Sequence, residues 1–120
     1  MARDMFSRIT LGLGGLIGGA GVALAAAASH GGDEHLLGAA STICLAHGPA
    51  LLALGLLRLP GRALQAAALL LGVGTLFFAG DLITRHFTGA GVFPGAAPLG
   101  GAAMIGGWIA VVVAAFIDSK

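Results

Sequence analysis

Long apolar runs separated by short polar gaps dominate this chain. The runs cover residues 9–28, 36–57, 63–83 and 99–117, and most polar side chains lie in the gaps between them. Each run has about 20 residues, which is the length that a helix needs to cross the hydrocarbon core of a bilayer. The pattern therefore predicts an all-α integral membrane four-helix bundle with short loops, in a single domain over residues 1–120.

The composition supports a protein whose environment is the lipid bilayer. Hydrophobic residues make up 58% of the chain and charged residues only 9%, whereas a soluble domain has about 25% charged residues. The net charge of +1 provides no basic field for nucleic acid, so no nucleic-acid partner is expected. The single cysteine, Cys44, lies inside the second run, which excludes a disulfide framework and indicates a buried thiol.

The first run could be confused with a secretory signal peptide. Arg3 and Arg8 precede it, and it ends in the small residues 25–29, as a cleavage site would. The run is longer than the apolar region of a signal peptide, which has about 7–15 residues. We therefore expect an uncleaved first transmembrane helix.

The positive charges predict an orientation, because lysine and arginine are retained on the cytoplasmic side of a membrane. In a four-helix layout five of the six fall on one side, and these are Arg3, Arg8, Arg58, Arg62 and Lys120. Only Arg85 falls on the other side. This distribution predicts that both termini are inside and that the polar gaps at 29–35 and 84–98 are outside.

Small residues form strips along two of the predicted helices. One strip repeats every four residues in the first run, at Gly15, Gly19, Ala23 and Ala27, and a similar strip in the fourth run includes Gly107. Such strips allow a second helix to approach closely. We expect them to pack helices of the same chain together, and a homo-oligomer or a larger membrane complex could use the same strips.

Asp81 and Arg85 are the charged pair nearest to the membrane interior. They are four residues apart, so they share a helix face and can form an ion pair. An unpaired carboxylate at the edge of the hydrocarbon is costly. Two interpretations follow: an ion pair that closes the outer end of the third helix, or a carboxylate that handles ions or protons.

His47 lies within the second run, directly before Gly48-Pro49. The proline removes a backbone donor, so a neutral imidazole bonded to a freed carbonyl or to a neighbouring helix is expected. Haem ligation by two histidines would need a second histidine at matching depth, and none lies in the apolar runs. No cofactor is therefore expected.

Three outer histidines, His30, His35 and His86, are ligand types for zinc or copper. Their spacing matches no strong metal motif, so we expect a solvated surface and no metal, with an outer-face metal site as the weaker hypothesis. The neighbouring Asp33 and Glu34 could instead serve as first-turn acids of the second helix, where the helix dipole favours negative charge.

Four segments resemble a known family of small membrane proteins. Pro98-Leu99-Gly100-Gly101, followed after five residues by Gly107-Trp108, is similar to the last-helix signature of domain of unknown function family four-two-three, the YgdD/YwdK-like proteins. Residues 28–30, 46–52 and 76–81 are similar to further segments of the family, in the same order, although a serine-type position of the family is Asp81 here.

The resemblance implies a four-helix protein of the bacterial inner membrane, or of the mitochondrial inner membrane with its termini in the matrix, and no established activity. Together with the strips, it marks six residues for helix packing: Gly15, Gly19, Gly100, Gly101, Gly107 and Trp108.

The chain contains no nucleophile–base pair, no phosphate-binding loop and no Cys-x-x-Cys motif, so we do not expect an enzyme. The best hypothesis is an interaction or accessory subunit that packs through its glycine and alanine strips. The alternative is a small transporter or channel that handles protons, ions or a small solute through Asp81, Arg85 and His47.

Overall fold

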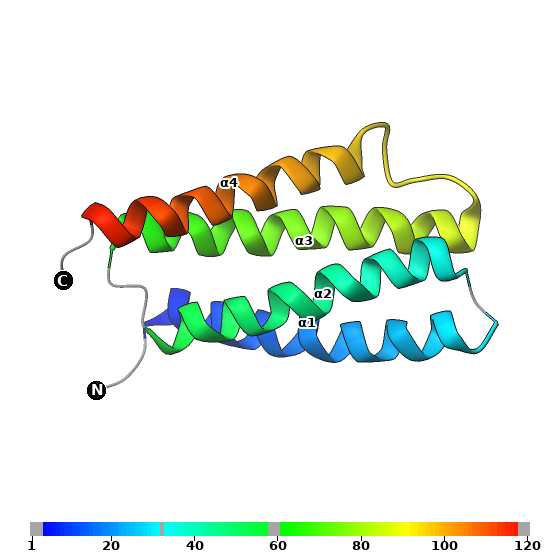
Figure 1. Ribbon diagram of the computed structural model, residues 1–120, viewed down its shortest axis with the longest axis horizontal. Coiled ribbons are helices and arrows are strands. Elements are labelled where there is room, and N and C mark those ends of the chain that lie inside the picture. Colours follow the sequence, from blue (N-terminus) through cyan, green and yellow to red (C-terminus); the bar gives the residue numbers. More distant parts are fainter. Residues whose placement is uncertain (1–3, 32, 58–60, 118–120) are drawn as a thin grey trace.

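The chain folds into four long helices. The computed structural model describes residues 4–31, 33–57 and 61–117, and its helices are α1 (Met5–Ser29), α2 (Glu34–Leu56), α3 (Arg62–Thr88) and α4 (Ala96–Ile117) (Figure 1). All four are long and apolar enough to cross a membrane. At 1.5 Å per residue they measure about 33 to 40 Å, against about 30 Å of hydrocarbon. The predicted fold class, an all-α membrane protein with four helices, is confirmed.

The helices form two hairpins that lie side by side. α1 packs along α2 and α3 along α4, while α2 and α3 pack against each other and join the hairpins. α1 touches α3 at few points, and α1 and α4 do not contact each other in the described residues. Both hairpin loops lie at one end of the molecule, called here the loop end. α1 and α3 start, and α2 and α4 finish, at the other end, called here the terminal end (Figure 1).

Caps fix where the first two helices begin. The carboxylate of Asp4 accepts a hydrogen bond of 2.7 Å from the Ser7 N–H at the start of α1. The same bond holds the pKa of the Asp4 carboxyl below its ordinary value. Asp33 caps α2 in the same way, with its side chain accepting from the N–H groups of His35 and Leu36.

The α3–α4 connection is shorter than the polar gap at 84–98. α3 continues to Thr88, and the Asp81–Arg85 ion pair on one helix face supports its last turns. The helix ends at Gly89, whose φ of 79° is in the left-handed region. α4 already begins at Ala96. Pro98 fits there because the N–H groups of a first turn have no helical partner. Three residues of the charge argument, Arg3, Arg58 and Lys120, lie outside the described residues.

Glycines bring α1 and α2 into backbone contact. A Cβ added at Gly48 of α2 would lie 2.7 Å from the Cα of Gly18 and 3.0 Å from the carbonyl oxygen of Gly14. About two turns from Gly48 towards the loop end, the Ser41 hydroxyl donates a hydrogen bond of 2.7 Å to the carbonyl of Gly21, and this buried bond joins the two helices. The two helices of the first hairpin can therefore pack closely, because glycines lie where their backbones meet.

Glycines also close the second hairpin. A Cβ added at Gly100 of α4 would lie 2.6 Å from both the carbonyl oxygen of Gly74 and the amide nitrogen of Phe78. A Cβ at Gly107 would meet the side chain of Leu71, a fully buried core residue of α3. Small residues thus determine the distance between helices in both pairs.

Candidate functional site

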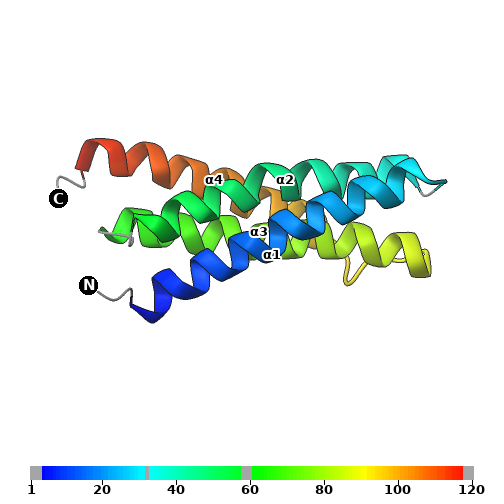
Figure 2. The same cartoon turned by 90° about the horizontal axis from the view of Figure 1, so that it is seen from below.

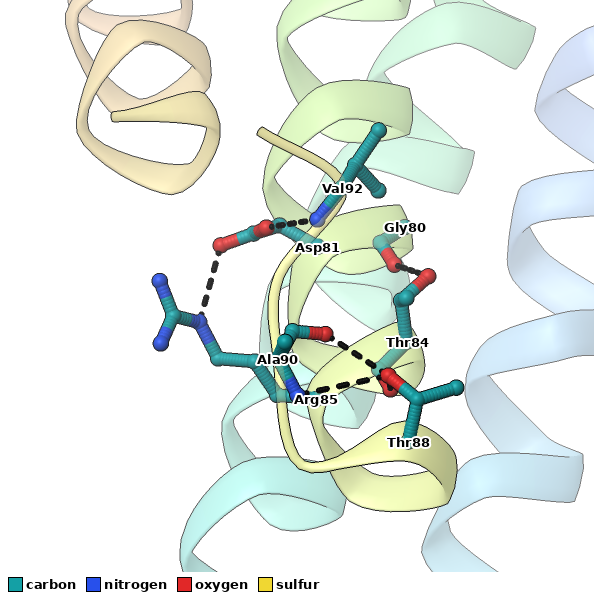
Figure 3. A network of polar contacts seen from close by, with 7 residues as sticks. All are labelled: Gly80, Asp81, Thr84, Arg85, Thr88, Ala90 and Val92. Atoms are coloured by element: carbon teal, nitrogen blue, oxygen red, sulfur yellow. Dashed lines mark hydrogen bonds and ion pairs between the residues drawn. The ribbon is translucent and has the colours of Figure 1, made fainter. Parts of the chain in front are cut away.

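Asp81 is a fully buried carboxylate near the loop end of α3. Its Oδ2 accepts a bond of 3.1 Å from Nε of Arg85, and its Oδ1 accepts a bond of 2.8 Å from the backbone N–H of Val92 in the loop (Figure 3). The Arg85 side chain itself is 42% exposed. The charge is therefore paired on one side by a guanidinium that reaches outward and on the other by the loop backbone.

The 89–95 loop folds back over Asp81. A Cβ added at Gly91 would collide with Oδ1 of Asp81, so only glycine leaves the loop backbone close enough to cover the carboxylate. The Thr88 hydroxyl lies 2.8 Å from the Thr84 carbonyl and 2.9 Å from the Ala90 carbonyl (Figure 3). Asp81 thus holds the turn between α3 and α4 in place.

A hydrogen bond joins the buried His47 of α2 to Trp108 of α4, which is itself partly exposed at the bundle surface. The indole Nε1 of Trp108 lies 3.1 Å from Nε2 of His47, and the other ring nitrogen, Nδ1, lies 2.8 Å from the carbonyl oxygen of Ile43. An indole nitrogen can only donate, so Nε2 accepts and Nδ1 carries the proton that is donated to Ile43. The geometry therefore matches a neutral imidazole in one defined tautomer.

The outer histidines do not gather into a metal centre. His30 Nδ1 bonds the Ala26 carbonyl at 2.8 Å, and the His86 ring packs edge-on against Phe87. No three His, Cys, Asp or Glu side chains of the described residues are close enough together to hold a metal ion. Asp33 is the cap of α2 and Glu34 its first residue, the first-turn acid role that the sequence offered as an alternative.

The six residues marked for packing divide into two groups. Gly100 and Gly107 lie in the α3–α4 contact, and Trp108 bonds His47. A Cβ at Gly15, Gly19 or Gly101 would meet no atom within 4 Å. The α1–α2 contact lies on the other side of α1, where Cβ atoms at Gly14 and Gly21 would meet α2 and where the backbone of Gly18 faces Gly48.

Four hollows on the surface of the described residues lie away from the Asp81–Arg85 pair and from His47. Two apolar hollows lie between α1 and α3, a third lies beside Arg62, and a fourth lies near Ser29 and Glu34 at the loop end. None of these four has Asp81, Arg85 or His47 in its lining. Along these hollows, therefore, no path joins the three residues that a transporter would use.

Two contacts of the site were missed from the sequence. The sequence did contain a sign of the His47–Trp108 bond, because the two residues lie at the same depth in the bundle. Each is about 18 to 20 Å along its helix from the loop end. The sequence contained no sign of the bond from the Val92 N–H to Asp81, since almost any residue type could supply a backbone N–H at this place in an irregular loop. Gly91 was visible only as one of several glycines in that loop.

Comparison with known proteins identifies a family without adding a function. No curated protein and no solved structure matches the chain. The family model described as protein of unknown function (DUF423) matches residues 24–101, a stretch that runs from the last turns of α1 through α2 and α3 to the Gly100 contact in α4. The chain belongs to the DUF423 family of proteins of unknown function.

Proposed function

We propose that the protein is a non-enzymatic integral membrane protein that associates with other membrane helices, in the first place those of a second copy, through the outer face of α1. The observation that carries this proposal is an open face of small residues. Gly12, Gly15 and Gly19 lie on the side of α1 that faces away from α2, and a Cβ at each would meet no atom within 4 Å.

The spacing of these glycines suits a helix–helix contact. They follow one another at intervals of three and four residues and continue into the exposed Ala23, so they line one side of the helix. Glycine in a helix interior costs about 0.5–1 kcal/mol relative to alanine. Nothing within the described chain uses this face, whereas a partner helix could use it for close backbone approach.

The same proposal places the chain in a bacterial or mitochondrial inner membrane with its terminal end in the cytoplasm or matrix. Arg8 and Arg62 belong to the terminal end and Arg85 to the loop end, in agreement with the retention of positive charge inside. A periplasm-active reporter fused after Lys120 is expected to be inactive in bacterial cells. Strong activity of that fusion would invert the orientation.

The transport alternative has weaker support. An intramembrane carboxylate is a candidate for ion handling, and Asp81 is fully buried. Its oxygens, however, accept bonds from Arg85 and from the Val92 N–H, which suits a fixed structural charge. His47 is engaged with Trp108 on α4 instead of facing Asp81.

Disulfide crosslinking in native membranes tests the association. In a Cys44→Ala background, which removes the single cysteine, Gly15→Cys is expected to form a product of twice the chain mass on mild oxidation. Adding Gly19→Leu should reduce that product at least fivefold, because a bulky side chain on the strip keeps the second helix away.

The matched control is Gly101→Cys in the same background, on α4, where a Cβ also meets open space. It should give little crosslinked product. Equal crosslinking from both positions, or a strict monomer at every position on the α1 face, would refute the proposal.

A further inference from the structure

An apolar groove runs between α1 and α3. It consists of two hollows of about 370 Å³ and 180 Å³, which share Leu13 of α1 and Leu76 of α3 in their lining. Cys44 and Leu51 of α2 lie in the lining of one hollow each. The two hollows adjoin along the lipid-facing side of the bundle, and the shared Leu13 side chain, whose Cδ2 would lie 3.0 Å from a Cβ at Gly72, stands in the wall of both.

The groove follows from how α1 is packed. α1 lies along α2 and touches α3 at few points, and Figure 2 shows it crossing α3 obliquely. On the α3 side, small side chains leave space for the groove, which is lined by Gly72, Ala79 and Gly80. A Cβ at Gly80 would meet nothing within 4 Å, so the space at that point is open to an occupant from the membrane.

A positive charge lies at the terminal end of this groove. A further hollow there is lined by Arg62, Gln65 and Ala66 of α3 and shares Phe6 and Leu69 with the groove. Arg62 is exposed and has no ion-pair partner among the described residues. It is also the first residue of α3, where the helix dipole favours an anion, and the cap residue Gly61 has no side chain to satisfy the first-turn amides.

We propose that this groove binds one anionic phospholipid, with the phosphate at Arg62 and one acyl chain along α1 and α3. The lining of the groove is hydrocarbon apart from the hydroxyls of Thr10 and Thr75 and the thiol of Cys44. Each hydroxyl already donates to a carbonyl of its own helix. The interior therefore selects an apolar chain, and the charged mouth selects an anion.

The chemistry of the groove favours a lipid as its occupant, because its apolar walls end beside an arginine. Basic pockets between helices on the cytoplasmic or matrix side are the type of site that binds anionic headgroups.

The site lies beside the face proposed for self-association. The groove is lined by Leu13 and Ile17 of α1 and, at its edge, by Leu16, which is about a ninth of a turn around the helix from Gly12. The two proposals are told apart by their readouts, because lipid retention tests the groove and crosslinking through Gly15→Cys tests the strip.

Native mass spectrometry of the intact, detergent-solubilised chain tests the lipid site, with phosphatidylglycerol and phosphatidylcholine of the same acyl chains titrated in parallel. The wild-type chain is expected to retain one phosphatidylglycerol per chain in preference to phosphatidylcholine. Gly80→Leu, whose Cβ would meet no atom within 4 Å and whose side chain would occupy part of the groove, should lower retention of both lipids at least tenfold, while Gly101→Leu on α4 should not.

A second pair of variants tests the headgroup. Arg62→Gln should lower phosphatidylglycerol binding about fivefold and leave phosphatidylcholine binding unchanged. Arg8→Gln, an exposed arginine of the same end that does not line these hollows, should change neither.

Three results would overturn the proposal: equal retention of the two lipids, equal loss with Arg62→Gln and Arg8→Gln, or displacement of lipid by a second chain when the protein dimerises. Tighter binding of a free fatty acid than of phosphatidylglycerol would assign the groove to a different ligand and would also overturn it.

Discussion

The two hairpins solve the same packing problem by different means. In α1–α2 glycines of one helix lie against the backbone of the other, and the Asp33 side chain caps the start of α2 after the loop. In α3–α4 the seam also relies on glycines, at Gly74 and Gly100, but the longer loop is fixed by a buried carboxylate. The first hairpin thus depends on shape, and the second on shape together with a buried charge.

The difference teaches where polar groups are tolerated in such a chain. Asp81 is buried only because Arg85 and the Val92 N–H satisfy it, as a charge in a low-dielectric setting requires. In the first hairpin Asp4 and Asp33 cap helices, and the hydroxyls of Thr10 and Ser41 donate to carbonyls. Substitutions that change only the packing at a glycine, and substitutions that remove only the buried charge, should therefore affect the two hairpins differently.

The largest effect is expected from Gly48→Ala. The added methyl would lie 2.7 Å from the backbone of Gly18, and two helix backbones cannot yield as a flexible side chain does. Overpacking of this kind costs about 1–3 kcal/mol or more, measured as the free energy of unfolding in mixed micelles. Gly15→Ala, on the open face of the same helix pair, should be neutral or slightly stabilising, and an equal loss from both would disprove the assigned seam.

An intermediate effect is expected from Asp81→Ala. It removes the acceptor of the Val92 N–H and the partner of the Arg85 cation, which should cost about 1–3 kcal/mol and increase proteolysis of the 89–95 loop. Asp81→Asn keeps an acceptor for the Val92 N–H and should lose less. Hydrogen exchange at the amides of α1 should be unchanged in both variants, and a loss of protection there would show that the hairpins are not separate.

The smallest effect is expected from the His47–Trp108 bond. Double-mutant cycles within membrane proteins average roughly 0.6 kcal/mol for such pairs, so His47→Phe and Trp108→Phe should show a coupling of about that size. Trp108 is the single tryptophan, and its emission should shift when His47→Phe removes the acceptor of the indole N–H. An unchanged spectrum would mean that the bond does not form in the membrane.

Much of the fold was predictable because the membrane imposes it. Apolar runs of spanning length can only be helices in lipid, and the four predicted runs all lie within or nearly within α1 to α4. The ends were less predictable, since the polar residues from Thr84 to Thr88 suggested a loop. They remain helical because the Asp81–Arg85 pair and the hydroxyls of Thr84 and Thr88 satisfy local partners.

The site was predictable only where both partners lie on one helix. The i,i+4 spacing indicated the Asp81–Arg85 pair, and the structure contains it. The choice between the two small-residue faces of α1 could not be made from the sequence, because Gly14 and Gly15 are chemically identical. Only the position of Gly48 on α2 decides which face is buried.

The lack of contact between α1 and α4 has a consequence for how the chain is assembled. Each hairpin is closed by contacts between neighbours in sequence, so little loop-closure entropy opposes either. The seam at Gly14 and Gly48 can form as soon as α2 has entered the bilayer, with no need for α4. The second hairpin then docks onto a finished surface of α2, and the order of synthesis becomes the order of folding.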